Sequence, residues 1–296
     1  METYRETTAG TMKSPKWLDR ILYPFAHHTL TLPNGQMHYV DEGQGEPIVF
    51  VHGTPTWSFV WRQQIKSLSR RYRCIAPDHL GFGLSEKPTS FSYTPEAHAQ
   101  NLEQLIEHLQ LKDITLVVHD FGGPIGLNYA LRHPSNVKRI VILNTWLWSL
   151  QEERQMMKIS GFLNGALGRL LYLNLGFSPR LLLPRGYHER RHLSKDVHRH
   201  YLRPLNKASN RIGTWHFAVA LKESGDWFEQ LWEQRENIRP ITKLILWGEK
   251  DALLPLHLLD KWQEAFPEAQ VQRYKAGHFV QEEKGGEIAD SILKFI

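Results

Sequence analysis

The segment that decides the fold is Leu116–Gly126, with the sequence LVVHDFGGPIG. An apolar run ends there at a polar residue, Asp120, and two glycines, Gly122 and Gly123, open a stretch of helical character. Small residues beside one polar side chain permit a sharp turn from a strand into a helix, which presents that side chain above the sheet. Taken alone, the same segment also fits an aspartate that caps a helix. Either way, it predicts a buried strand, a turn at Asp120 and a helix.

Other short apolar runs share this buried-strand character and alternate with helical segments. That alternation is typical of a mostly parallel sheet with helices on both faces. Ahead of it, Pro33-Asn34-Gly35 predicts a tight turn and so an antiparallel hairpin. The hairpin strands are expected at His28–Leu32 and Gln36–Val40, and the parallel strands at Pro47–Val51, Cys74–Ala76, Ile114–Val118, Ile140–Leu143 and Leu244–Trp247.

Residues 146–223 break the strand rhythm. They are helical, aromatic and basic in character, and glycine and proline punctuate them. No Ser/Gly-rich linker separates them from the flanking segments. We interpret residues 146–223 as a helical cap inserted into a single core domain, which is made of residues 1–145 and 224–296.

The composition bounds the class of protein. With 41% hydrophobic and 23% charged residues, the 296-residue chain is globular rather than disordered. A net charge of +5 from 36 basic and 31 acidic residues is too mild to indicate a nucleic-acid partner. The single cysteine, Cys74, rules out an internal disulfide and favours a reducing cytoplasm. The first twenty residues lack the apolar run of a signal peptide, and no later stretch is long and apolar enough to span a bilayer, so we expect no membrane partner.

Two further polar residues follow the predicted elements in a telling order. Asp251 comes just after the strand Leu244–Trp247, and His278 lies in a loop before the last helical stretch. Each alone fits a turn residue or a surface histidine. The order Asp120, Asp251, His278 is, however, that of nucleophile, acid and base in α/β-hydrolases. In that arrangement the backbone N–H groups of Thr54 and Phe121 form the predicted oxyanion hole.

Several of these motifs, taken together, resemble the haloalkane dehalogenases, and the resemblance covers nearly the whole core. It implies an α/β-hydrolase fold and a hydrolase without a cofactor or metal, acting on a small apolar substrate and water. By the same resemblance Asp120 is the nucleophile, His278 the base and Asp251 its acid partner. The cap segments Tyr201–Pro204 and Asn210–Ile212 also resemble the dehalogenase-like β-lactone decarboxylases of bacterial olefin synthesis. The motifs that carry the dehalogenase resemblance are His52–Ser58, Pro77–Ser85, His119–Gly123 and Ala276–Glu282.

The chain departs from the dehalogenase pattern at two positions. Phe121 stands where the family usually has a tryptophan that holds the departing halide, and Thr54 stands where it usually has asparagine or glutamate. A phenyl ring offers no hydrogen-bond donor. Loss of one donor to a leaving halide costs about 1–3 kcal/mol, or roughly one to two orders of magnitude in rate. The candidate residues of the substrate pocket are Trp57, Trp146, Trp148 and Trp215. The last three lie in the predicted cap and are possible replacement donors for the halide.

Other readings stay open at this point. Epoxide hydrolysis also uses an aspartate nucleophile but needs hydroxyl groups in the cap, and a non-catalytic binding protein on the same fold is a further alternative. The run His188–His192 matches the H-E-x-x-H pattern of zinc proteases, but two arginines sit inside it and no third ligand is signalled. The basic stretch from Arg185 to Arg203 fits a solvated cap face better than a nucleic-acid site. We expect a monomer or homodimer. The cap hydroxyls available for an epoxide are Tyr172, Tyr187 and Tyr201.

Overall fold

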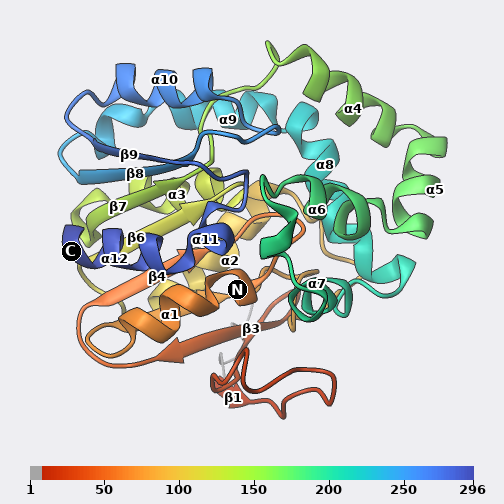
Figure 1. Cartoon of the computed structure of the whole chain (residues 1–296), viewed down its shortest axis with the longest axis horizontal. Coiled ribbons are helices and arrows are strands. Elements are labelled where there is room, and N and C mark those ends of the chain that lie inside the picture. Colours follow the sequence, from red (N-terminus) through yellow and green to blue (C-terminus); the bar gives the residue numbers. More distant parts are fainter. Residues whose placement is uncertain (1–8) are drawn as a thin grey trace, which may run out of the picture.

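A nine-stranded sheet forms the centre of the molecule, in the order β1-β2-β3-β5-β4-β6-β7-β8-β9 (Figure 1). The computed structural model describes residues 9–296, so the first eight residues of the polar N-terminal segment lie outside the described residues. The strands are β1 (Ala9–Thr11), β2 (His28–Leu32), β3 (Gly35–Glu42), β4 (Pro47–Val51), β5 (Arg73–Pro77), β6 (Ile114–His119), β7 (Val137–Leu143), β8 (Thr242–Gly248) and β9 (Gln270–Tyr274).

The sheet is antiparallel from β1 to the β3–β5 pair and parallel from β5 to β9. The predicted hairpin and all five predicted parallel strands are confirmed. The sequence did not indicate β1 or β9, which form the two edges. β9 has the sequence QVQRY, and none of its residues is buried, so it lacks the apolar run by which the central strands were found.

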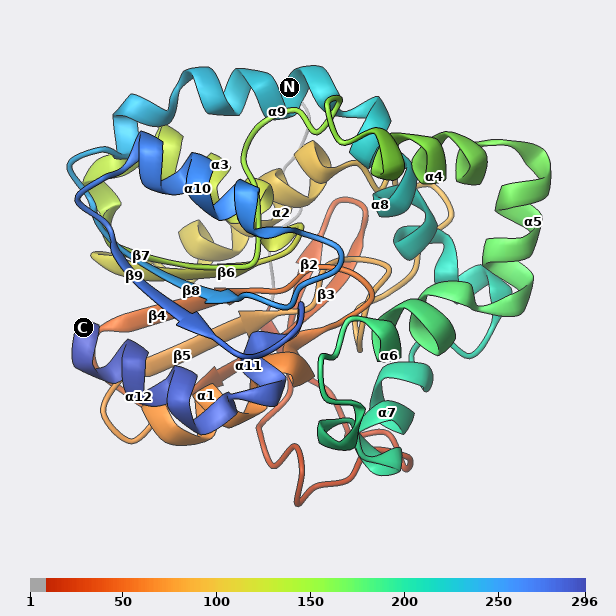
Figure 2. The same cartoon turned by 45° about the horizontal axis from the view of Figure 1, so that its top comes forward.

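Helices cover both faces of the sheet (Figure 2). Their buried residues separate into two large clusters, one on each face. One face carries α1 (Arg62–Leu68), α11 (Val280–Glu283) and α12 (Gly285–Phe295). The other carries α2 (Pro95–His108), α3 (Gly122–Arg132), α9 (Gly225–Glu233) and α10 (Leu256–Ala265).

The chain between β7 and α9 forms a separate helical group at one end of the sheet (Figures 1 and 2). Leu163, Tyr172, Trp215 and Val219 give this group a small apolar cluster of its own. Among residues 9–296, no helix has both the length and the apolarity needed to cross a bilayer. The helices of the group are α4 (Arg154–Asn164), α5 (Ala166–Leu175), α6 (Leu183–Arg185), α7 (Lys195–Leu202) and α8 (Ile212–Glu223), with a π-helical turn at Ser178–Leu182.

The turn between β6 and α3 is among the tightest parts of the fold. Asp120 has a φ of +52°, a left-handed conformation that is uncommon for residues other than glycine. Two nearby glycines, Gly122 and Gly53, leave room for the turn. A Cβ at Gly122 would lie 2.1 Å from the carbonyl oxygen of Val51, and one at Gly53 would lie 2.1 Å from Oδ1 of Asp120. The glycines thus let β4, β6 and the start of α3 approach one another.

We predict that Gly122→Ala lowers the free energy of unfolding by about 1–3 kcal/mol, because the added methyl group meets backbone rather than a movable side chain. Urea denaturation measures the change. Gly286→Ala is the matched control, since Gly286 also lies in the first turn of a helix and has no atom within 4 Å of its Cβ. That variant is expected to be as stable as the parent or slightly more stable. Equal destabilisation by both changes would contradict the prediction.

Candidate active site

Asp120 lies at the apex of the β6–α3 turn, at the carboxyl ends of the parallel strands. Its side chain is nearly buried, with 7% of the residue exposed. The backbone N–H of Thr54 donates to Oδ1 of Asp120 at 2.7 Å. The backbone on either side is held as well, since the N–H of Asp120 donates to the carbonyl of Asn144 at 3.1 Å. The side chain therefore projects from a fixed turn and does not cap the following helix, which has no side-chain cap.

His278 stands between the two aspartates that the sequence analysis paired with it. Its Nδ1 lies 2.8 Å from Oδ2 of Asp251, in a hydrogen bond. Its Nε2 lies 3.4 Å from Oδ2 of Asp120 but has no hydrogen-bond partner among residues 9–296. The structure thus brings together Asp120, His278 and Asp251, although 131 positions separate Asp120 from Asp251 in the chain.

Asp251 is fixed by donors from two elements. Asn144 Nδ2 donates to its Oδ2 at 2.9 Å, and the backbone N–H groups of Leu253 and Leu254 donate to its Oδ1 at 2.7 and 3.0 Å. Asn144 in turn bridges to Gly248 at the end of β8. These donors fix the side chain of Asp251, which in turn orients the ring of His278 through Nδ1. Nothing in the sequence around Asn144 indicated this contact.

The charges of these groups reinforce one another. Burial by itself would raise the pKa of Asp120, but the neighbouring His278 imidazolium outweighs burial and holds that pKa below its usual range. Burial would likewise lower the pKa of His278, yet the carboxylates of Asp251 and Asp120 raise it to about 10. At neutral pH the centre therefore contains an ionised Asp120 beside a protonated His278.

A second histidine, His119, supports the loop that carries His278. Its Nε2–H donates to the carbonyl oxygen of His278 at 2.8 Å. Burial, and next the charge of His278, lowers the pKa of His119 to about 3, so His119 stays neutral. This residue lies inside the quoted segment Leu116–Gly126, but nothing in its spacing indicated such a role. Only the fold places it under the His278 loop.

Aromatic side chains line the space beside Asp120. The Phe121 ring stacks on Phe217 with centroids 4.5 Å apart, and the edge of Trp146 meets it at 4.9 Å. Two donors in this region lack partners among residues 9–296: the hydroxyl of Thr54 and the indole N–H of Trp146, both buried. The surroundings are thus apolar, with two unused polar hydrogens.

The other three candidate tryptophans lie elsewhere or are already engaged. The indole N–H of Trp57 donates to the carbonyl of His200 at 3.1 Å, and that of Trp215 donates to the carbonyl of Leu163 at 2.8 Å. Trp148 packs between Trp232 and Trp262. Of the four, Trp146 alone contacts Phe121 through its ring.

Two glutamates join the helical group to the His278 loop. Glu282 forms a buried bidentate pair with Arg62 and also accepts from the hydroxyl of Tyr201. Glu283 accepts from the backbone N–H groups of Gly277, His188 and Glu189 at 2.7–3.0 Å. The run His188–His192 is therefore a loop with a short 3-10 turn, not the α-helix that an H-E-x-x-H zinc site needs. Within residues 9–296, no group of three or more His, Cys, Asp or Glu side chains is arranged so that it could hold a metal ion.

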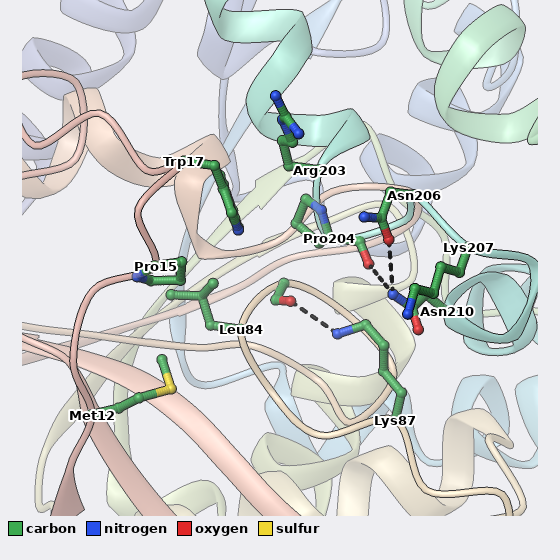
Figure 3. A pocket seen from close by; sticks show the side chains of 11 residues that line it. Met12, Pro15, Trp17, Leu84, Lys87, Arg203, Pro204, Asn206, Lys207 and Asn210 are labelled. Carbon is green, nitrogen blue, oxygen red and sulfur yellow. Dashed lines mark hydrogen bonds between the residues drawn. The ribbon is translucent and has the colours of Figure 1, made fainter.

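A cavity of about 370 Å³ opens away from these residues (Figure 3). Trp17 and Leu84 form apolar parts of its wall, and Lys87 and Lys207 contribute charge. None of Asp120, His278 and Asp251 lines it. The cavity is therefore separate from the candidate active site, which is enclosed in this structure.

Comparison with known proteins places the chain in a family. A family model described as the alpha/beta hydrolase fold matches residues 46–285. A cis-3-alkyl-4-alkyloxetan-2-one decarboxylase of Shewanella oneidensis is 36% identical over 94% of this chain and 90% of its own length. Haloalkane dehalogenase 2 of Mycobacterium tuberculosis is 33% identical over 93% of this chain and 96% of its own length.

The fold agrees with this sequence similarity. The haloalkane dehalogenase DatA from Agrobacterium tumefaciens superposes with a TM-score of 0.81 at 25% identity, over 90% of this chain and 94% of that one. The mostly parallel sheet with helices on both faces is the architecture expected from the sequence. The chain belongs to the α/β-hydrolase family and, within it, to the haloalkane-dehalogenase-like enzymes.

Proposed function

We propose that Asp120 is the nucleophile of a hydrolase that forms a covalent ester with a small apolar substrate. The observation that carries this proposal is the side chain of Asp120, fixed at a left-handed turn with its Oδ2 3.4 Å from Nε2 of His278. A carboxylate needs no base to remove a proton before it attacks. It displaces a leaving group from a saturated carbon, and one carboxylate oxygen becomes the ester oxygen.

In the second half of the reaction, His278 activates water. Its Nε2 faces Asp120, so a water that contacts Nε2 beside the ester can lose a proton to Nε2 and attack the ester carbonyl carbon of Asp120. Esterification removes the negative charge of Asp120, which is one of the causes that raise the pKa of His278. That pKa therefore falls in the ester, which favours loss of the imidazolium proton to solvent and leaves a neutral imidazole to act as the base. The N–H groups of Thr54 and Phe121 stabilise the tetrahedral oxyanion.

We predict that Asp120→Asn abolishes turnover and that His278→Phe traps the ester, because attack needs the carboxylate and only hydrolysis needs the imidazole. Mass spectrometry of the intact protein, after incubation with a haloalkane, measures the adduct. The expected mass gain equals the alkyl fragment and is absent in the double variant. If no haloalkane that the parent hydrolyses leaves an adduct on His278→Phe, the aspartyl ester is refuted.

The charge arrangement also predicts how stability depends on pH. The raised pKa of His278 means that its ion pairs stabilise the fold fully below about 6.5, the ordinary value, and that this contribution is lost as pH rises towards about 10. The lowered pKa of Asp120 adds stability that is lost only as pH falls below the ordinary aspartate range. The difference in free energy of unfolding between the parent and His278→Phe should therefore shrink as pH rises from about 6 to about 10. A constant difference across that range would contradict the charge assignment.

A leaving halide would need a hydrogen-bond donor beside Asp120, and Phe121 offers none. The hydroxyl of Thr54 and the indole N–H of Trp146 are the unused donors nearby. The cap tyrosines suit epoxide opening less well, because Tyr172 donates to the carbonyl of Thr214 and Tyr201 to Glu282. Only Tyr187 keeps a free hydroxyl among the three.

A strained lactone is the second candidate substrate, favoured by the missing donor at Phe121 and by the oxetanone decarboxylases among the relatives. Asp120 would attack C4 of a 3,4-dialkyl oxetan-2-one and break the C4–O1 bond, so that the ring oxygen leaves as part of a tethered carboxylate. The C2–C3 bond then breaks with loss of carbon dioxide. Its electron pair forms the C3–C4 double bond, and the C4–O bond to Asp120 breaks to restore the carboxylate. Ring strain drives the first step, so no halide donor is required.

We predict that the protein converts a cis-3,4-dialkyl oxetan-2-one to an alkene and carbon dioxide faster than it releases bromide from a bromoalkane of similar length. In water enriched in oxygen-18, dehalogenation places label on Asp120 and then in the alcohol, whereas the lactone reaction restores Asp120 without water and leaves it unlabelled. Gas chromatography with mass detection follows both products.

Phe121→Trp is the matched variant for this comparison. It restores an indole N–H beside Asp120 and is expected to raise bromide release by roughly tenfold or more without raising alkene formation. Fast bromide release by the parent with an untouched lactone would refute the lactone as substrate. It would leave the aspartyl ester intact.

A further inference from the structure

The far end of the helical group turns an apolar surface to solvent. Of the nine large apolar side chains that are exposed in residues 9–296, seven lie within residues 159–181. Their exposed fractions run from 39% at Leu171 to 60% at Leu167. Single exposed leucines are ordinary, but a concentration of this kind marks an interaction surface. We call it the distal face, and it consists of Ile159, Phe162, Leu167, Leu170, Leu171, Leu175 and Leu181.

Helix α5 turns its apolar side to solvent and its less apolar side to the rest of the protein. Leu167, Leu170, Leu171 and Leu175 follow the spacing of an apolar helical stripe, which a surface helix normally buries against the core. In α5 this stripe is exposed, and the buried residues are Gly168 and Tyr172.

Helix α4 adds to the same surface while packing on α8 by other residues. Ile159 and Phe162 are exposed. Ser160 bonds to the carbonyl of Val219, and Leu163 joins the small cluster with Trp215. Figures 1 and 2 both show α4 followed by α5 at the edge of the molecule opposite the C-terminus.

The segment that carries most of the distal face has charges of one sign. Residues 154–188 contain no aspartate or glutamate. All their cations are exposed, and none forms an ion pair with any residue in 9–296. Carboxylates do lie beside this segment: Glu153 directly precedes Arg154, and Glu223 of α8 accepts from the amide of Asn164. The cations are Arg154, Lys158, Arg169, Arg180 and Arg185.

One of these cations also belongs to a cationic cavity. Arg180, next to exposed Leu181, lines a cavity of about 280 Å³ together with Arg199, Arg203 and Arg211. Of these four, Arg199 alone is ion-paired, with Asp196 at 3.0 Å. Arg211 is buried and already donates to backbone carbonyls, so the exposed Arg180 and Arg203 are the two guanidinium groups that suit contact with a phosphate.

We propose that the distal face docks on the surface of an anionic lipid bilayer, with the leucines of α5 in the acyl region and the flanking cations at the lipid phosphates. Exposed apolar side chains on a segment whose charged residues are all cations are what interfacial binding needs, and neither helix has to cross the bilayer. A second copy of the chain fits less well, because an isologous contact would bring five unpaired cations against the same five. This inference goes beyond the proposed reaction and does not depend on it.

Flotation of the full chain with vesicles tests the proposal. We expect the protein to float with vesicles of phosphatidylcholine and phosphatidylglycerol and much less with phosphatidylcholine alone. The pair Leu170→Asn and Leu175→Asn should lower the bound fraction on anionic vesicles by about tenfold. The pair Arg154→Gln and Lys158→Gln should lower the preference for the anionic lipid by a similar factor, as should added salt.

Matched controls change the same residue types outside the distal face. Ile21→Asn alters an isoleucine that is 84% exposed, and the pair Arg70→Gln and Lys112→Gln removes two exposed cations. These variants should float as the parent does. Circular dichroism and turnover of a water-soluble substrate check that every variant is folded, and they report on the reaction separately.

Two outcomes would overturn the proposal. One is that the parent does not float, or floats equally well with the distal-face variants. The other is that light scattering finds a dimer, abolished by Leu170→Asn and Leu175→Asn, in a protein that does not bind vesicles. The distal face would then be a contact between copies of the chain.

Discussion

A nearly buried carboxylate keeps its charge only where positive charge and N–H donors stand within a few ångströms, and the centre of this structure is built around that requirement. Asp120 receives the N–H of Thr54 and faces the imidazolium of His278. His278 in turn is held protonated by Asp251. Each charge thus depends on the next. The strand ends and tight glycine turns matter because they bring these groups to the same edge of the sheet.

The supporting contacts form a second layer with one task, the placement of His278. Asn144 and two backbone N–H groups fix Asp251, which fixes one ring nitrogen. Neutral His119 holds the backbone of the His278 loop. The other ring nitrogen is left without a partner. An imidazole that is constrained on one side and free on the other suits proton exchange with a bound water.

The sequence predicted the central strands and the turn at Asp120 because buried apolar runs, glycines and polar strand ends leave local signals. It predicted the grouping of Asp120, Asp251 and His278 through their order relative to the strands. It did not indicate β9, which is too polar, or the roles of Asn144 and His119, which exist only because the fold brings distant segments into contact. It also gave no means to choose among the four candidate pocket tryptophans, because their positions depend on how the helical group packs. The sequence did not predict that the apolar stripe of α5 is exposed, because periodicity does not show which side of a helix faces the core.

Glu283 links the His278 loop to the segment that leads from α6 to α7. Its carboxylate accepts hydrogen bonds from the backbone N–H of Gly277, beside His278, and from those of His188 and Glu189 in that segment. The N–H of His278 also donates to the carbonyl of Gly186 in that segment. An outward movement of this segment would therefore also displace the loop that positions the His278 imidazole. The position of the segment between α6 and α7 and the position of the His278 imidazole are therefore linked through the same hydrogen bonds.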